Sequence, residues 1–266
     1  DLFPFFRQNL PEGYLLGVIR EEFGALLDGT DLSLLALVGG QGIGRVSVTP
    51  EGVRPDGETE PLEISHLLTA ENTTEHFAQL VRQYARVAVS GVVPKFIATD
   101  AEQRPETMGK PTLRTRFHII KGSDESTPFL GFNEFYTMRV LARLNVVPVA
   151  SCQMSDDGKV LVVDRFDVDE HGAPCCGVED ACGLLGLPPH EKYSPSIERV
   201  WKATRAYIPN NRTRAQSEHL GWQLLANYVV RNADCHSKNI ALCYSSRVDV
   251  AFTPVYDLVT TQAYPR

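Results

Sequence analysis

The stretch "NADCHSKN", residues 232–239, places a carboxylate, an imidazole, an ammonium and an amide within six positions, at Asp234, His236, Lys238 and Asn239. An apolar run precedes the stretch and another follows it, so we expect a short loop held between two buried elements. Polar side chains in such a loop cost free energy unless they pair with one another or bind a ligand. The loop is therefore the first candidate for a functional site.

Asp257 adds a second carboxylate to this loop. It lies in "VYDL", at the end of a hairpin whose length can return it beside Asn239. Mg²⁺ prefers a few carboxylate or amide oxygens and takes its other ligands from water and phosphates. In a phosphotransferase loop of this kind, Asp234 would orient the attacking hydroxyl and Lys238 would neutralise phosphoryl charge. The alternative is a polar loop capped by its own side chains. A strand that ends in Lys121 favours phosphoryl transfer.

Composition narrows the class of protein. The chain has 266 residues, of which 43% are apolar and 22% charged, as in globular proteins with one large or two smaller domains. Its net charge of −7 argues against a free-standing nucleic-acid binder. No apolar run approaches the length of a membrane span, and no signal peptide is recognisable. Six irregularly spaced cysteines without a CxxC pair favour a reduced, cytoplasmic protein over a disulfide framework or a zinc site. We also expect the sequence to be part of a longer protein.

Periodicity predicts a sheet-rich part followed by a helix-rich part, with a boundary near residues 166–178. Asn72 and Glu75 form a capping-box pattern at the start of the first helix. The helix over 217–230 is apolar almost all round, so we expect it to be buried. We expect helices at 72–86, 132–145, 178–187, 196–207 and 217–230, and strands at 86–98 (two, around a glycine turn), 112–121, 147–154, 159–166, 240–244 and 248–259.

Two further features are weaker signals. The stretch "GGQGIG" (39–44) fits neither GxGxxG nor GxxxxGK[ST], so we interpret it as a flexible turn before a strand in "RVSVTP". His118 is flanked by apolar residues, and such a histidine is more often a packed core residue than a ligand.

At these motifs the chain resembles the HipA family, the kinase toxins of bacterial toxin–antitoxin modules. The resemblance runs nearly end to end and rests on several motifs in the family's order. They are "FFRQNLPEG" (5–13), "SGVVPKF" (90–96), "FHIIK" (117–121), "NEFYT" (133–137), "VVDRFD" (162–167), "VEDACGLLGLPPHEKY" (178–193), the loop 232–239 and "PVYDL" (254–258).

The resemblance implies an α+β fold: a two-lobed protein-kinase-like (HipA-like) fold with a sheet-rich N-terminal part and a mainly helical C-terminal part. It implies an N-terminal subdomain over 1–60, an ATP-binding lobe over 61–167 and a helical catalytic lobe over 168–266. Departures are Val93 in the glycine loop and Cys235 in the catalytic loop, together with segments missing before residue 1 and after the Tyr-Asp motif.

It also implies roles for individual residues, with ATP and Mg²⁺ as cofactors. Glu134 could orient the ATP lysine, by general kinase logic. The matched positions are Asp234 as the catalytic aspartate, His236 and Lys238 in its loop, Asn239 and Asp257 as Mg²⁺ ligands, Lys121 as the ATP lysine, Asp164, Arg165 and Phe166 as the adenine hinge, Asp167 as a candidate ribose contact, and Ser90 with Gly91 in the glycine loop.

Two functions follow as expectations. The first is a serine/threonine protein kinase that phosphorylates a translation-related protein, such as an aminoacyl-tRNA synthetase, arrests growth and autophosphorylates at Ser90. The second is a catalytically weak partner of a HipB-like helix-turn-helix antitoxin, which acts as a co-repressor and meets DNA only through the antitoxin. The presence of all the matched polar residues favours the first. A metal-dependent phosphohydrolase would require HxxxD or HD pairings, which we do not find.

Overall fold

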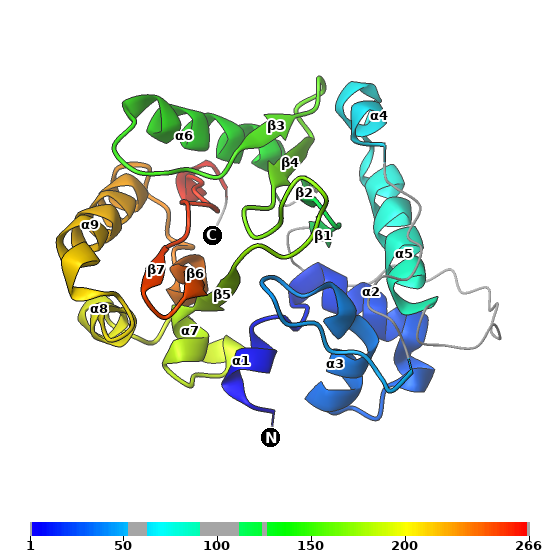
Figure 1. Cartoon of the computed structure of the whole chain (residues 1–266). Helices are drawn as coiled ribbons and strands as arrows, with labels where there is room; N and C mark the ends of the chain where they lie inside the picture. Colours follow the sequence, from blue (N-terminus) through cyan, green and yellow to red (C-terminus); the bar gives the residue numbers. More distant parts are fainter. Residues whose placement is uncertain (1, 53–62, 91–111, 124–126, 265–266) are drawn as a thin grey trace.

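The computed structural model describes residues 2–52, 63–90, 112–123 and 127–264. The first 90 residues, within these ranges, form short helices that pack as one layer, with Val18, Leu35 and Val81 in their shared core. Figure 1 shows them beside the first sheet. The elements are α1 (Pro4–Arg7), α2 (Gly13–Phe23), η1 (Gly24–Leu26), α3 (Asp31–Val38), η2 (Gly39–Gln41), α4 (Ile64–Thr69) and α5 (Thr74–Ser90).

An antiparallel four-stranded sheet follows, in the order β1-β2-β4-β3. Helix α6 (Leu130–Leu144) packs on one face of this sheet, while α2, α4 and α5 contact the other (Figure 1). The strands are β1 (Thr112–Arg114), β2 (His118–Gly122), β3 (Cys152–Met154) and β4 (Val160–Asp164).

The alternation of side chains along the central strands decides which way Lys121 points. Successive residues of a strand face opposite sides of the sheet. On β4, Val160 and Val162 pack with the N-terminal helices, whereas Leu161 packs with α6. Lys121 of β2 is paired with Leu161, so its side chain shares the face covered by α6. The Lys121 side chain therefore lies in the apolar layer between the sheet and α6, where its charge requires a buried partner.

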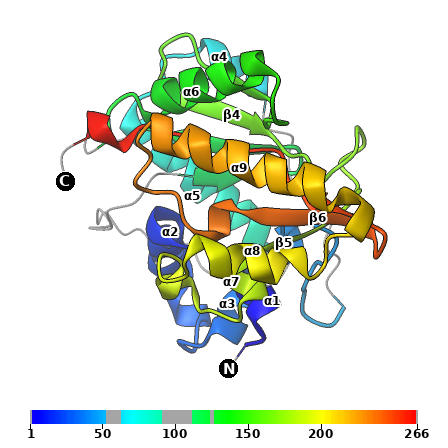
Figure 2. The same ribbon diagram turned by 90° about the vertical axis from the view of Figure 1, so that its left-hand side faces the viewer.

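The C-terminal part is built around a second sheet, β5-β6-β7, which is also antiparallel. Three helices surround it, and the shared core includes Val200, Leu220 and Phe252. Helix α9 contacts β7 of this sheet, and Figure 2 shows α9 on the side of the molecule that faces the viewer. The elements are β5 (Gly177–Asp180), α7 (Ala181–Leu184), η3 (Pro189–Glu191), α8 (Ile197–Arg205), η4 (Asn210–Arg212), α9 (Thr213–Val229), η5 (Ser237–Asn239), β6 (Ala241–Ser246), β7 (Asp249–Phe252) and η6 (Thr261–Ala263).

One backbone contact connects the two sheets. After β7 the chain forms a parallel bridge between Val255 and Val149, in which the Ala150 amide donates to the Val255 carbonyl at 2.9 Å. Asp257 follows two residues later with φ +55°, a left-handed conformation that aspartate tolerates better than most side chains do. The bridge therefore brings the end of the second hairpin to the first sheet. In the part of the chain that the structure describes, no helix is both long and apolar enough to cross a bilayer.

The mixed α/β, kinase-like fold expected from the motifs is confirmed, but several local predictions are wrong. Helix α5 begins after Thr73, whose hydroxyl accepts from the His76 amide, so Thr73 and not Asn72 is the cap. It continues through 86–90, where we expected a strand. The strand expected over 112–121 is a hairpin, with a turn between β1 and β2.

Three further predictions fail in the same way. Residues 177–180 form β5 before the short α7, where a continuous helix was expected. Residues 46–50 contain no strand, because the Val48 amide bonds to Gly39 in the preceding turn. Helix α9 is exposed at Trp222, Leu225, Tyr228 and Val229, by 41% to 80%. Its buried residues are His219, Leu220, Gln223 and Asn227, and the loop 232–239 explains why two of them are amides.

Two helical glycines provide a test of how α6 is placed. A Cβ at Gly131 would lie 3.2 Å from the Leu161 amide nitrogen of β4, whereas a Cβ at Gly221 in α9 would meet nothing within 4 Å. We expect Gly131→Ala to lower the free energy of unfolding by about 1–3 kcal/mol, because the strand backbone cannot yield. Gly221→Ala should raise it by up to about 1 kcal/mol through helix propensity. Urea unfolding measures both, and equal effects would show that α6 does not pack closely on β4.

Candidate functional site

The loop after α9 is held by amide side chains. The Asn232 side chain donates to the Asn227 side chain at 2.8 Å and accepts from the Asp234 amide at 3.0 Å. Gln223 of α9 donates to the Asn239 carbonyl at 3.0 Å. Gln223 and Asn227 lie on the buried face of α9, which is why that face is polar. The helix therefore fixes the loop through hydrogen bonds, and Asp234 projects from a rigid support.

Asn239 and Asp257 meet, as the hairpin length predicted. The Asn239 side-chain nitrogen donates to Asp257 Oδ2 at 3.0 Å, and Asn239 Oδ1 accepts from the His236 amide at 2.9 Å. Asn232 donates to the Asp257 carbonyl at 3.1 Å. The loop and the segment after β7 thus form one polar unit.

Lys121 completes this unit from the first sheet. Its ammonium donates to Glu134 Oε1 on α6 at 2.7 Å and also pairs with Asp257. Lys121 is 9% and Glu134 1% exposed. Burial lowers the pKa of Lys121, but the charges of Asp257 and Glu134 outweigh burial and raise it above its ordinary value. The lysine is therefore held charged between two carboxylates, and the role suggested for Glu134 matches this geometry.

Lys238 points to a different region, the N-terminal motif. Its ammonium donates to Glu12 Oε1 at 2.5 Å, and Lys192 donates to Glu12 Oε2 at 3.0 Å. In the same motif, the Gln8 side chain donates to the Val178 carbonyl at 2.9 Å. The first dozen residues therefore contact both β5 and the loop 232–239. In this structure Lys238 is engaged by Glu12.

His236 is in contact with Tyr193. The Tyr193 ring meets the His236 ring edge-on, with centroids 5.0 Å apart, and the Tyr193 hydroxyl donates to Asp234 Oδ1 at 2.5 Å. Burial and then Lys192 lower the pKa of His236, against a weaker opposing effect of nearby carboxylates. A neutral imidazole at neutral pH fits a structural role in the loop.

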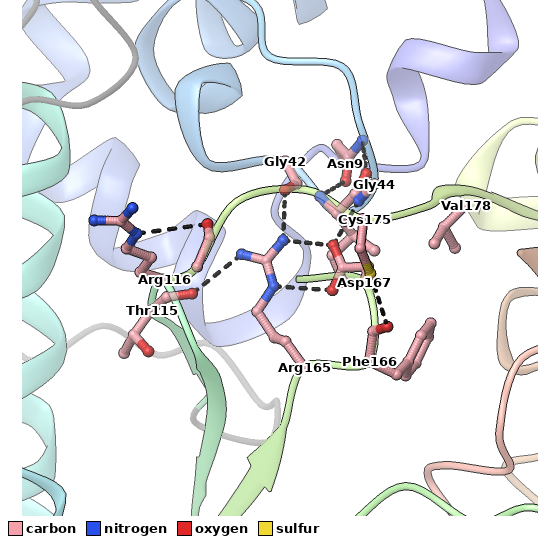
Figure 3. A network of polar contacts seen from close by, with 12 residues as sticks. Asn9, Gly42, Gly44, Thr115, Arg116, Arg165, Phe166, Asp167, Cys175 and Val178 are labelled. Atoms are coloured by element: carbon pink, nitrogen blue, oxygen red, sulfur yellow. Dashed lines mark hydrogen bonds and ion pairs between the residues drawn. The ribbon is translucent and has the colours of Figure 1, made fainter. Parts of the chain in front are cut away.

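The segment 164–167 was expected to form the adenine hinge, at 164–166, and the ribose contact, at Asp167. In the structure it connects distant parts of the chain (Figure 3). Arg165 pairs with Asp167 at 2.6 Å and donates to the carbonyls of Thr115 and Gly42 at 3.1 and 3.0 Å. Asp167 also accepts from the Gly44 amide at 2.7 Å and is 1% exposed. In this structure the Asp167 carboxylate is engaged in a buried pair, and the ribose contact expected of it stays a prediction.

The neighbours of Arg165 and Asp167 face other partners. Phe166 stacks with Tyr256 at a centroid distance of 6.0 Å, next to Asp257. Asp164 lies 3.6 Å from the His118 imidazole, and these two paired residues share the face of the sheet opposite Lys121. His118 is partly buried, with a pKa lowered by burial against the pull of Asp164. Phe166 and Asp164 thus remain candidates for nucleotide contact.

Of the residues assigned to the glycine loop, Ser90 lies within the part of the chain that the structure describes. Ser90 is the last residue of α5. Gly91, Val93 and the rest of "SGVVPKF" lie outside the described residues.

The donor set suits a hard cation at one place. Among the described residues, no group of three or more His, Cys, Asp or Glu side chains could hold a metal ion. The Asp257 carboxylate and the Asn239 amide, however, lie within hydrogen-bond distance of each other. Mg²⁺ takes carboxylate and amide oxygens together with water and phosphate, so these residue types fit that cation. In this structure Asn239 turns its amide nitrogen to Asp257, while its oxygen accepts from the His236 amide.

Sequence reasoning missed three residues of this site. Glu12 and Tyr193 lie in motifs that were quoted without roles for these positions, and Asn232 opens the loop itself. A signal was available for each: a carboxylate or a phenol inside an otherwise recognisable motif requires a partner.

Comparison with known proteins supports the motif-based resemblance. Residues 87–266 match the HipA-like C-terminal domain, and residues 1–49 match the HipA N-terminal domain. "Putative kinase Y4mE" of Sinorhizobium fredii is 30% identical over 98% of the chain, and a "Putative kinase" of Haemophilus influenzae is 27% identical over 56%.

A solved structure has the same fold. A chain in the Shewanella oneidensis MR-1 complex of HipA, HipB and operator DNA superimposes over 98% of the present chain, with a TM-score of 0.67 and 24% identity. The present chain spans 65% of that chain and of Y4mE, and 46% of the Haemophilus protein.

Glu12 predicts an acid-sensitive contribution to stability. Burial raises the pKa of Glu12, but Lys238 and Lys192 outweigh burial and leave it below its ordinary value of 4.5. A carboxylate whose pKa is lowered in the folded state contributes its full stabilisation above pH 4.5. The contribution is lost as the pH falls through the folded-state pKa. Glu12→Gln should therefore lower the free energy of unfolding by about 1 kcal/mol at pH 7, and the difference should shrink below pH 4.5.

Urea unfolding at a series of pH values measures this difference. Glu218→Gln, which changes an exposed carboxylate paired within α9, is the matched control and should show little effect at any pH. A Glu12→Gln deficit that stays constant into acid would mean that Glu12 does not act through its charge.

Proposed function

The chain belongs to the HipA family, and from this membership and the geometry of the site we propose that it transfers the γ-phosphoryl group of ATP to a serine or threonine hydroxyl of a protein. The observation that carries the proposal is the convergence of Lys121, Glu134, Asp257 and Asn239 from four separate elements. A lysine on a strand, a glutamate on the following helix and a cation-binding aspartate are the paired groups on which protein kinases depend.

Lys121 and Glu134 would serve the nucleotide. Lys121 presents a point charge on a rigid strand, which suits the oxygens of the ATP phosphates. Glu134 holds Lys121 from the side of α6, so the ammonium keeps one anchor when Asp257 turns to another partner. Phe166 and Asp164 lie at the end of the same sheet and would meet the base.

Asp257 and Asn239 would hold Mg²⁺ between them. The cation, when bound, neutralises negative charge on the transferred phosphoryl group. The contribution of the chain is to keep the two side chains adjacent: Asn232 donates to the backbone carbonyl of Asp257, and the His236 amide donates to the side-chain oxygen of Asn239.

Asp234 would receive the acceptor hydroxyl. The backbone amide of Asp234 donates to the Asn232 side chain. Asp234 lies five positions before Asn239, the proposed metal ligand, so the acceptor and the phosphoryl group would approach from one side of the loop. A carboxylate there orients the hydroxyl and takes its proton as the phosphoryl group is transferred.

Partners and targets form the outer part of the proposal. The Shewanella complex contains HipB and operator DNA, which supports a HipB-like helix-turn-helix antitoxin as partner, with DNA contacted through it. We propose a translation-related substrate, such as an aminoacyl-tRNA synthetase, with growth arrest as the result and Ser90 as an autophosphorylation site. A role as a catalytically weak co-repressor is the alternative, and the intact Lys121–Glu134 pair favours catalysis over it.

Two conservative substitutions test the catalytic assignment. Asp234→Asn and Asp257→Asn each remove one charge, and asparagine tolerates the positive φ of residue 257. Each should reduce phosphate transfer from labelled ATP by about 10²–10⁴-fold. Asp156→Asn, in the exposed turn between β3 and β4, is the control and should retain activity. Near-normal transfer by Asp257→Asn would overturn the metal assignment.

A ligand pair tests Lys121. Lys121→Met keeps the aliphatic stem, and it should weaken ATP binding by about tenfold or more, since a hydrogen bond to a charged group contributes about 1.5–3 kcal/mol. Adenosine lacks the phosphates, so its affinity should change little. Calorimetry with both ligands separates the two effects, and Lys202→Ala on the exposed side of α8 is the control. Equal losses for both ligands would mean that Lys121 acts only on the fold.

A further inference from the structure

Tyr193 places a hydroxyl on the carboxylate that is expected to receive the substrate. The Tyr193 hydroxyl donates to Asp234 Oδ1 at 2.5 Å, although the tyrosine is 57% exposed. An exposed phenol gains little from burial, so its ring is held by the hydrogen bond to a charged group and by the edge-on contact with His236. The contact is chemically the one that a serine or threonine hydroxyl would make with Asp234.

The backbone of Tyr193 is fixed to the loop that it covers. The carbonyl of Lys192 accepts from both the amide and the hydroxyl of Ser237, at 3.1 and 2.8 Å. The Lys192 side chain is tied to Glu12. Only the Tyr193 side chain is therefore able to leave Asp234 without disrupting the loop.

There is space for the ring to move into. Tyr193 lines a pocket of about 600 Å³ between the catalytic loop, α8 and α9, whose walls include Pro195, Tyr228 and Arg231. Rotation of the side chain into this pocket would uncover Asp234 while the segment 192–193 stays in place.

We propose that Tyr193 is a specificity-determining residue: its hydroxyl occupies the acceptor position of the unliganded site and keeps water from Asp234 until a polypeptide hydroxyl displaces it. This inference rests on the proposed function. Without Tyr193, a water oxygen could attack the γ-phosphorus of ATP while its proton passes to Asp234 and the bond to ADP breaks. A polypeptide binds through many contacts and can displace one hydrogen bond, whereas a water molecule has no other binding energy to use.

The test is the rate of Mg-ATP hydrolysis with no protein acceptor added, measured as the release of inorganic phosphate. Tyr193→Phe removes only the hydroxyl and should raise the rate about tenfold. Tyr207→Phe changes another exposed tyrosine, at the end of α8, and should leave the rate unchanged. The double variant Tyr193→Phe/Asp234→Asn should lose the increase, because water would then have no base. A purely structural role for Tyr193 would not produce a gain that depends on Asp234.

The outcomes separate the two proposals. If the unaltered chain binds Mg-ATP in calorimetry but neither Tyr193→Phe nor Tyr193→Leu hydrolyses it faster, the inference on Tyr193 is wrong and the kinase proposal stands. A fall in hydrolysis in both variants would also overturn the inference, since Tyr193 would then support Asp234. If no variant binds Mg-ATP, the proposed function fails and the inference fails with it.

Discussion

A buried ammonium between two carboxylates is the interaction on which the arrangement of this molecule depends. Lys121 comes from the first sheet, Glu134 from the helix that covers it, and Asp257 from the segment that returns from the second sheet. A buried charge is tolerated only where it is paired, and removing one partner strands the others. The contacts of α6 with β4 and the Val149–Val255 bridge therefore have to place the three charged groups within hydrogen-bond distance of one another. The same demand fixes the positions of three of the groups that we assign to phosphoryl transfer.

A second set of contacts attaches the N-terminal region to this centre. Arg165 and Asp167 join β4 to the loop around Gly42 and Gly44, so this buried pair holds the N-terminal helices against the sheet. Glu12 reaches further, to Lys192 and to Lys238 of the loop 232–239. Residues that look like nucleotide contacts in a motif can thus act as structural ties, and the difference is visible only in the pattern of their partners.

The sequence alone was sufficient for the part of the site that is encoded by local spacing. Asp234, Asn239 and a short hairpin to Asp257 are close in the chain, so their meeting could be predicted, and the pairing of Asn239 with Asp257 confirms it. Lys121 and Glu134 are separated by 13 residues, and kinase logic anticipated their contact. By contrast, Glu12 and Lys238 are 226 residues apart, and no local period connects them.

The secondary-structure predictions were wrong where tertiary contacts override the local propensity of the sequence. The alternating valines of 86–90 suggest a strand, but that segment continues α5, whose first turns already pack against the N-terminal layer. The amides on the inner face of α9 look out of place on a helical wheel, and only the loop that they hold explains them.

The attachment of Lys238 to Glu12 has a thermodynamic consequence. Coupling between two binding events is reciprocal. A ligand that draws Lys238 away from Glu12 would therefore loosen the docking of the first dozen residues, and a partner that fastens those residues would weaken the same ligand by an equal factor. The N-terminal segment and the loop 232–239 share one lysine, so the docking of the N-terminal segment and the binding of any ligand that uses Lys238 would form a single linked equilibrium.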